Sequence, residues 1–265
     1  MLELLGIYLL FGMLVGLLAG LIGSGGATVI VPILHYTLNR QGVDPSIIHH
    51  MALATCMINI LFTSSISTYA HHKRGAVPWR SIIWMVPGIL LGSFAGSYAT
   101  GYIPAKPLAT GFGFFLIYAS LSMFIEIRPK ASRHLPGIFG MICMGLFVGV
   151  LSGVLGIGGA VITMPLLLVC NVPLLSAIAT AGAFGFPIAV AGGAGYIFAS
   201  LGHADLPPYS LGFVYLPALL GLVPASILVA PFAVRFAHAL PQKILRNGLG
   251  VFIAFIAYRM ITANV

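Results

Sequence analysis

Residues 16–34 read GLLAGLIGSGGATVIVPIL, and residues 149–167 read GVLSGVLGIGGAVITMPLL. The two stretches align without a gap, and each carries a glycine cluster followed by a proline. The residues of the first stretch that recur in the second are Gly16, Gly20, Gly23, Gly25, Gly26, Ala27 and Pro32. A looser match follows, since ALAT at 52–55 is similar to AIAT at 177–180. The chain therefore contains an internal duplication, and each copy has one glycine cluster inside an apolar run.

The composition is that of a membrane protein. Of the 265 residues, 60% are hydrophobic and 6% are charged, and the mean hydropathy is +1.09. Soluble domains carry about 25% charged residues, so a soluble enzyme, a disordered protein and a nucleic-acid binder are excluded. The net charge of +8, from 12 Lys and Arg against 4 Asp and Glu, is explained by basic loops on the cytoplasmic side of a membrane.

Eight apolar blocks follow one another, separated by charged or turn-rich breaks. They are Leu4–Leu38, Ile47–Ala70, Val77–Thr100, Pro104–Ile125, Pro136–Cys170, Pro173–Leu201, Leu206–Val234 and Pro241–Ile261. The first block starts without a basic segment, so we expect a retained helix rather than a signal peptide. The first and fifth blocks are too long for one crossing, because the 35 residues of the first would make about 50 Å of helix. Both contain a glycine cluster at which a helix can break.

The distribution of Lys and Arg distinguishes two topologies. If each long block crosses once, the two sides of the membrane hold seven and five basic residues. If each block turns at its glycine cluster and crosses twice, they hold nine and three, which fits the positive-inside rule. We therefore expect an all-α polytopic membrane protein with two inverted repeats of about five helical elements each, both termini outside. The repeats are residues 1–130 and 131–265 of one integral membrane domain, and the short limb 27–38 is expected to be a half-helix.

The two glycine clusters are candidate anion-binding sites. They consist of Gly23, Ser24, Gly25 and Gly26 in the first copy and Gly156, Ile157, Gly158 and Gly159 in the second. Each precedes a predicted helix start, where unshielded backbone N–H groups bind anions without a basic side chain; Thr28 lies in the first turn of one such helix. Inverted repeats bring the two starts together near the membrane middle. The alternative is that these glycines only allow close helix packing.

Three other glycine series are spaced every four residues, which is typical of faces where helices pack closely. They are Gly12, Gly16 and Gly20, then Gly88, Gly92 and Gly96, and finally Gly145, Gly149 and Gly153. We expect these series to serve packing.

The second block carries a polar stripe. Thr55, Asn59 and Thr63 recur every four residues and so share one helical face. Hydroxyls and amides can donate to the oxygens of an anion, so we include these three residues in the substrate site. Thr180 is the counterpart of Thr55 in the second copy and is included as well. Hydrogen bonding between helices is the alternative role.

Titratable groups are scarce within the apolar blocks, which hold no mid-span Lys, Arg, Asp or Glu. A proton relay through a buried acid is therefore not expected. If transport is coupled to protons, histidine must carry them, and His35 and His50 are the candidates. The alternative is that both histidines lie at the membrane boundary.

The duplicated motif, GLIGSGGATVIVPIL and GVLGIGGAVITMPLL, resembles the signature of the TauE/SafE sulfite exporter family over essentially the whole chain. The resemblance implies a multi-pass inner-membrane transporter of small, often sulfur-containing anions such as sulfite, sulfonates or sulfoacetate. Ser24 and Ile157 depart from a fully glycine-rich core, which implies two unequal half-sites.

We expect a secondary transporter rather than an enzyme, with no cofactor and no metal. Its expected partners are a small anion and the lipid bilayer, not nucleic acid, and homo-oligomerisation is left open. Two other functions were weighed, a transmembrane thiol redox carrier and a membrane scaffold. A redox carrier needs a reactive cysteine pair, and Cys56, Cys143 and Cys170 form no CxxC motif.

Overall fold

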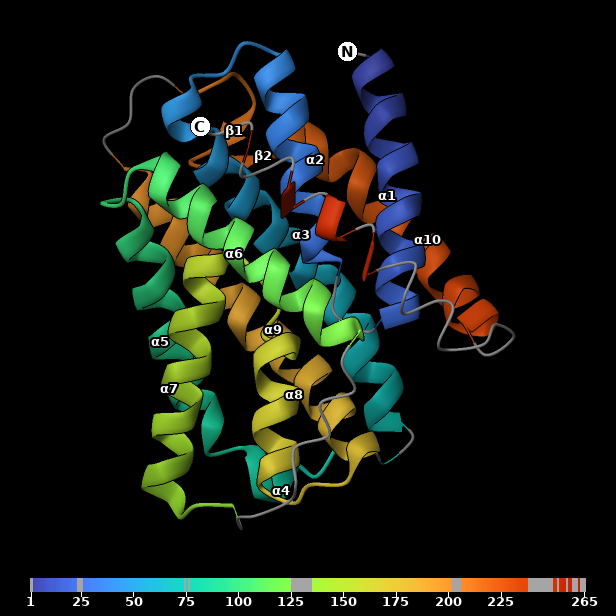
Figure 1. The fold of residues 1–265 in the computed structure, drawn as a ribbon, viewed down its shortest axis with the longest axis vertical. Coiled ribbons are helices and arrows are strands. Elements are labelled where there is room, and N and C mark those ends of the chain that lie inside the picture. The colour runs from blue at the N-terminus through green and yellow to red at the C-terminus, as the bar shows by residue number, and fades with distance from the viewer. Residues whose placement is uncertain are drawn as a thin grey trace.

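The computed structural model describes residues 2–22, 26–73, 75, 77–124, 135–201, 206–237, 250–251, 253–255, 257–258 and 262. These residues are almost entirely helical (Figure 1), which confirms the all-α polytopic class. The elements are α1 (Leu2–Ile22), α2 (Ala27–Arg40), α3 (Pro45–Lys73), α4 (Trp79–Ile82), α5 (Met85–Thr100), α6 (Ala105–Phe124), α7 (Ile138–Leu155), α8 (Ala160–Val169), α9 (Leu174–Ala199), β1 (Ser210–Leu211), β2 (Val214–Tyr215) and α10 (Leu216–Ala237).

Both long apolar blocks break at their glycine clusters. The first becomes the pair α1 and α2, and the fifth becomes the pair α7 and α8. In Figure 1, α1 descends from the N-terminus and α2 returns to the top, whereas α7 rises from the bottom and α8 returns there. The two pairs thus enter from opposite ends, and both turns lie at mid-height. Opposite entry is what inverted repeats require; the repeat bounds 1–130 and 131–265 stay predictions.

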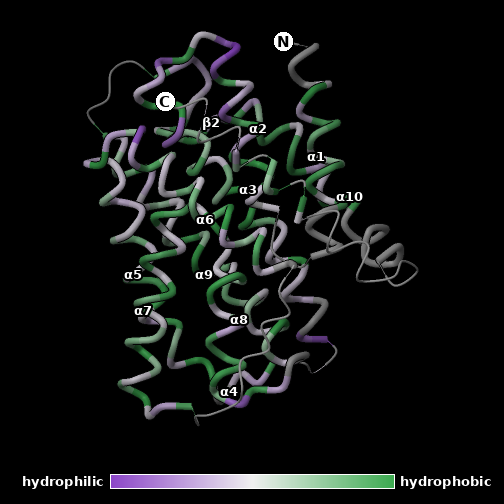
Figure 2. Tube along the Cα trace, viewed as in Figure 1, coloured by the Kyte–Doolittle hydropathy of each residue, from purple (hydrophilic) through white to green (hydrophobic). Residues whose placement is uncertain are grey.

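Three described helices are long and apolar enough to cross a membrane: Pro45–Tyr69, Ile138–Leu155 and Ser176–Ala199. Figure 2 shows hydrophilic segments gathered at the turns of the two ends and largely hydrophobic helices between them. Several basic residues needed for the sidedness count lie outside the described part of the chain, so that count stays a prediction. They are Arg74, Arg128, Lys130, Arg133, Lys243, Arg246 and Arg259.

Glycine faces join α5 to α7. A methyl group added at Gly88 or Gly92 would overlap the carbonyl oxygens of Ile142 and Leu146. The contact is reciprocal, because a methyl group at Gly149 would lie 2.5 Å from the carbonyl oxygen of Ile89. α1 packs on α10 in the same manner through Gly12 and Gly16. The packing role expected for these series is confirmed; Gly20 has a described backbone, but its side of the contact is outside the described residues.

Helices α3 and α9 cross at the centre, where α3 also packs against α2, α10 and α6. Two hydroxyls tie neighbouring helices to this centre. Tyr196 on α9 donates to the carbonyl of Gly153 on α7 at 2.8 Å, and Ser93 on α5 donates to the carbonyl of Ile188 at 2.8 Å. The crossing of α3 and α9 therefore fixes the position of α7, whose last residues lead into the second glycine cluster.

A short β-hairpin precedes α10 and was not expected from the sequence. Ser210 pairs with Tyr215 and Leu211 with Val214, around a turn in which Gly212 has a φ of 59°. The seventh apolar block, Leu206–Val234, was expected to be helical. Its first part differs because the positive φ at Gly212 turns the chain back before α10 begins.

Candidate functional site

The two copies of the glycine cluster end in the same backbone conformation. Gly26, the N-cap of α2, has φ 70° and ψ 4°, and Gly159, the N-cap of α8, has φ 72° and ψ −12°. These residues occupy equivalent positions of the duplication. L-residues rarely adopt this left-handed region, so glycine is needed at both helix starts. Gly23, Ser24 and Gly25 lie outside the described residues.

The second cluster is described in full and forms a buried turn between α7 and α8. Gly156 ends α7 with a φ of 64°, and the N–H of Ile157 donates to the carbonyl of Ser152. The N–H groups of Ile162 and Thr163 donate to the carbonyl of Gly159. The first N–H groups of a helix precede any intrahelical acceptor and form its positive end. That end of α8 is therefore directed into the buried turn.

Two hydroxyl groups flank this helix start. A methyl group at Gly159 would lie 3.1 Å from the Oγ of Ser152 and 3.6 Å from the Oγ1 of Thr163. Both side chains are completely buried, and neither hydroxyl has a hydrogen-bond partner among the described residues. Most buried polar groups in proteins are hydrogen-bonded. Two unsatisfied hydroxyls beside a helix N-terminus therefore mark this turn as a candidate binding site.

Asn59 and Thr180 extend the same pattern. Both are fully buried, and the amide nitrogen and oxygen of Asn59 and the hydroxyl of Thr180 have no partner within the described chain. Their helices pack on the turn: Ile60 of α3 lies 3.3 Å from the methyl position of Gly158, and α9 contacts α8. We call the four unsatisfied residues the interior polar set. They are Asn59, Ser152, Thr163 and Thr180.

The predicted polar stripe on α3 does not act as one unit. The hydroxyl of Thr55 accepts a hydrogen bond from the N–H of Tyr215 at 2.9 Å. The hydroxyl of Thr63 donates to the carbonyl of Asn59 at 3.2 Å. Both hydroxyls therefore have partners in the protein, and of the three stripe residues Asn59 is the one whose side chain is unsatisfied. Thr28, in the first turn of α2, is buried.

The two predicted histidines have different surroundings. Nε2 of His50 lies 3.0 Å from the carbonyl oxygens of both Thr100 and Ile103. Because both partners are acceptors, Nε2 carries the proton, and His50 holds the turn between α5 and α6. His35 on α2 is half-buried and its ring meets the ring of His49, a residue that the sequence analysis did not select.

Ser152 and Thr163 were also missed by the sequence analysis. Ser152 lies inside the Gly145–Gly153 series, whose spacing indicated packing alone. Thr163 follows Gly159 by four residues, one helical turn, whereas the first copy has Ile30 at the equivalent position. Comparing the copies position by position, rather than only for identities, would have singled out Thr163.

Formal charge is absent from the described interior. The buried polar residues there are Ser, Thr, Asn and His, without Lys, Arg, Asp or Glu. Within the same residues no three His, Cys, Asp or Glu side chains gather as a metal site would require. Cys56 is buried, Cys143 is exposed, and all three cysteines are free. The interior polar set can therefore offer neutral donors and acceptors only.

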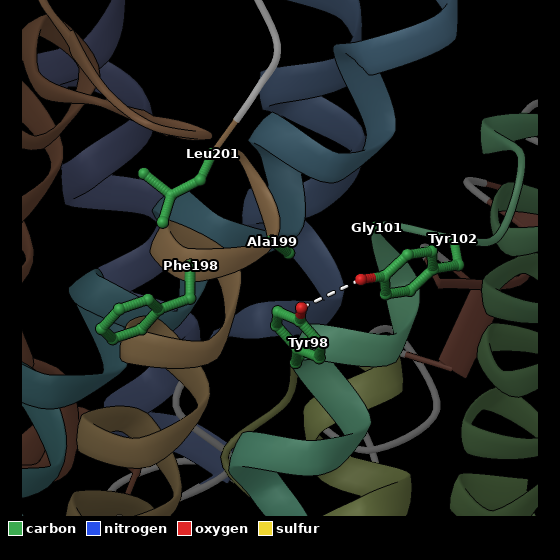
Figure 3. Close-up of a pocket in the computed structure, with 6 residues that line it drawn as sticks. All are labelled: Tyr98, Gly101, Tyr102, Phe198, Ala199 and Leu201. Carbon is green, nitrogen blue, oxygen red and sulfur yellow. Dashed lines mark hydrogen bonds between the residues drawn. The ribbon is translucent and has the colours of Figure 1, made fainter.

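A separate pocket lies where α5 and α9 end (Figure 3). It is lined by Tyr98, Gly101, Tyr102, Phe198, Ala199 and Leu201. The hydroxyls of Tyr98 and Tyr102 are 2.9 Å apart, and both tyrosines are exposed. Exposed tyrosines at helix ends are typical of the membrane–water interface, so this pocket is not our candidate substrate site.

Broken helices that lead to buried neutral donors inside a polytopic helical protein define a membrane transporter. Comparison with known proteins agrees with this class. The chain belongs to the sulfite exporter TauE/SafE family, whose sequence model matches residues 8–260.

Relatives named as transporters cover nearly the whole chain. A probable membrane transporter protein of Haemophilus influenzae is 30% identical over 95% of this chain and 96% of its own. A probable membrane transporter protein of Methanocaldococcus jannaschii is 26% identical over 92% and 91%, respectively. One from Bacillus subtilis is 26% identical over 89% of this chain and 91% of its own. No solved structure shows significant similarity to the chain.

Proposed function

We propose that the protein is a secondary transporter of small anions, probed first with sulfite and sulfonates, and that the anion binds at the N-terminus of α8. The observation that carries this proposal is the interior polar set, four fully buried and unsatisfied side chains on the helices around that turn. The proposal includes a location in the inner membrane and inverted repeats over residues 1–130 and 131–265.

Neutral donors suit a substrate that must leave the site again. The positive end of α8 supplies backbone N–H groups, and the hydroxyls of Ser152 and Thr163 can turn toward an oxygen of the ligand. A lysine or arginine would bind an anion more strongly in a low-dielectric interior, and would slow its release. Because sulfite and sulfonates present several oxygens, one ligand can accept hydrogen bonds from several of these donors.

The first copy supplies the second, unequal half of the proposed site. Gly26 and Thr28 lie at the start of α2, as Gly159 and Ala160 do at the start of α8. Ile30 replaces the hydroxyl of Thr163 in this copy. We therefore assign the stronger anion contacts to the second copy, with Gly156, Ile157 and Gly158 forming the turn, and weaker ones to Gly23, Ser24, Gly25 and Gly26.

Thr55 and Thr63 have a secondary place in the proposal. Both lie one turn from Asn59 on α3. Their hydroxyls already contact the protein backbone, so they shape the face around Asn59 rather than donate to the anion. Thr180 remains a direct donor, because its hydroxyl is unsatisfied.

Two matched substitutions test the site. Thr163→Val removes one hydroxyl at nearly equal volume, and Asn59→Leu removes the amide. Each is expected to weaken the binding of sulfite by about tenfold to a hundredfold, because an unmatched buried partner costs about 1–3 kcal/mol. Thr110→Val is the control, since that hydroxyl donates to a carbonyl of its own helix. The measurements are binding isotherms and melting curves on the same preparations; an unchanged dissociation constant in both site variants would sink the assignment.

A further inference from the structure

His49 is a buried imidazole whose two ring nitrogens have no hydrogen-bond partner in the described residues. It lies near the start of α3, and 1% of its surface is exposed. Its ring meets the ring of His35 edge-on, with centroids 6.0 Å apart and an interplanar angle of 87°. Phe112 of α6 covers another side, with centroids 5.7 Å apart. Nδ1 of His35 is likewise buried without a partner.

The surroundings of this pair leave it as the one unbonded titratable cluster in the described interior. The titratable groups that face His49 are His35 and His50, and Nε2 of His50 holds two carbonyls. The tyrosines on neighbouring elements donate elsewhere: Tyr196 of α9 to a carbonyl of Gly153 and Tyr215 of β2 to Gln41. The charged residues at this end are all exposed. They are Arg40, Asp44 and Lys106.

We propose that His35 and His49 share one proton, bound and released in each transport cycle, so that movement of the anion is coupled to the proton gradient. The proton adds to a lone pair on a ring nitrogen and returns to water, and no covalent bond of the substrate changes. Two imidazolium rings at this separation would repel each other, so the pair holds one proton. This inference rests on the proposed function.

Helix α2 connects the histidine pair to the proposed site. His35 and Gly26 lie on the same helix, nine residues apart in sequence, which corresponds to about 13 Å along the axis. Over that distance, in a protein interior, a positive charge increases the affinity for an anion by about tenfold. Protonation therefore favours the anion-bound form, and loss of the proton favours release.

Transport by purified full-length protein in proteoliposomes tests the coupling, with radiolabelled sulfite as the probe. His49→Gln removes titration and keeps a polar side chain; His72→Gln changes an exposed histidine and is the control. We expect H49Q to lose accumulation driven by an imposed pH gradient, by about tenfold, while sulfite counterflow at equal pH persists. H72Q should keep both activities. Gradient-driven accumulation by H49Q at the level of the unchanged protein, or equal loss of accumulation and counterflow, overturns the proposal.

A second measurement does not depend on the substrate. Histidine NMR on isotopically labelled protein in lipid nanodiscs identifies the His49 signal by its absence in H49Q, or by its shift in H35Q should H49Q not fold. We expect this signal to titrate between about pH 5 and pH 8. A signal that stays neutral over that range overturns the proposal even if sulfite is transported. If the signal titrates but sulfite is not moved by the unchanged protein, the proposed substrate fails and the proton site stands.

Discussion

The hydroxyl of Thr55 accepts a hydrogen bond from the backbone N–H of Tyr215, 2.9 Å away, and so joins α3 to β2. Both residues are buried. The N–H belongs to the last residue of the β-hairpin, directly before α10 begins. The start of α10 is therefore anchored to the central helix by a side chain that the sequence pattern had assigned to substrate.

Removing this anchor should lower stability. Thr55→Val keeps the shape of the side chain but leaves the N–H of Tyr215 buried and unsatisfied, at a cost of about 1–3 kcal/mol. Thr63→Val is the matched control, because the Thr63 hydroxyl bonds only carbonyls of its own helix. Unfolding in detergent should show a clearly larger loss for T55V than for T63V. Equal losses would mean that the hairpin contact contributes nothing.

The glycine contact between α5 and α7 should not accept a methyl group. Gly88→Ala would drive the added carbon into the carbonyl of Ile142, and the backbone shifts needed to relieve such overlap cost about 1–3 kcal/mol. Gly111 on α6 is the control, since an added methyl group meets no atom within 4 Å. Gly111→Ala should stabilise the protein by about 0.5–1 kcal/mol. Melting temperatures that fall alike in both variants would contradict this packing.

The left-handed glycine at the start of α8 should matter for more than conformation. Gly159→Ala imposes strain of about 1–2 kcal/mol and puts a methyl group between Ser152 and Thr163. Gly42→Ala imposes the same kind of strain, with φ 73° and no atom within 4 Å of the new carbon. We expect both variants to lose stability, but only G159A to lose sulfite transport. Transport at the normal rate by folded G159A would remove this turn from the site.

Asp44 should make stability depend on pH below neutrality. The backbone N–H of Ser46, 2.8 Å from Oδ1, and its hydroxyl hold the pKa of Asp44 below the ordinary value. With the pKa lowered in the folded state, the stabilisation is present above the unfolded pKa of about 3.9 and disappears as the pH falls through the folded value. Asp44→Ala should therefore melt earlier than the unchanged protein at pH 7 and alike below about pH 3. A difference that persists in acid would point to a role other than charge.

The sequence predicted those parts of the fold that depend on local pattern. The breaks after Ile22 and Leu155 follow from glycine clusters inside runs too long for one helix, and the contact between α5 and α7 follows from glycine spacing alone. The hairpin at 210–215 was not predictable in this way. Its strands are two residues long and apolar, so they have the same composition as the start of a helix.

The candidate site was predictable only where a residue type is unusual in its setting. Asn59 was selected because an amide is rare in an apolar helix, and Gly159 because its neighbours repeat. Ser152 and Thr163 could not be selected, since serine and threonine in membrane helices commonly bond their own backbone. Whether a given hydroxyl does so depends on which helix lies beside it, as the contrast between Thr63 and Thr163 shows.

The reciprocal glycine contact of α5 and α7 behaves mechanically like two racks with matching teeth. Its glycines recur every four residues, or about 6 Å of helix axis. A slide of any smaller step would drive the side chains between the glycines into the opposing carbonyls. These two helices must therefore move as one rigid body, and any change of access during a transport cycle has to come from rotation of this body against the others.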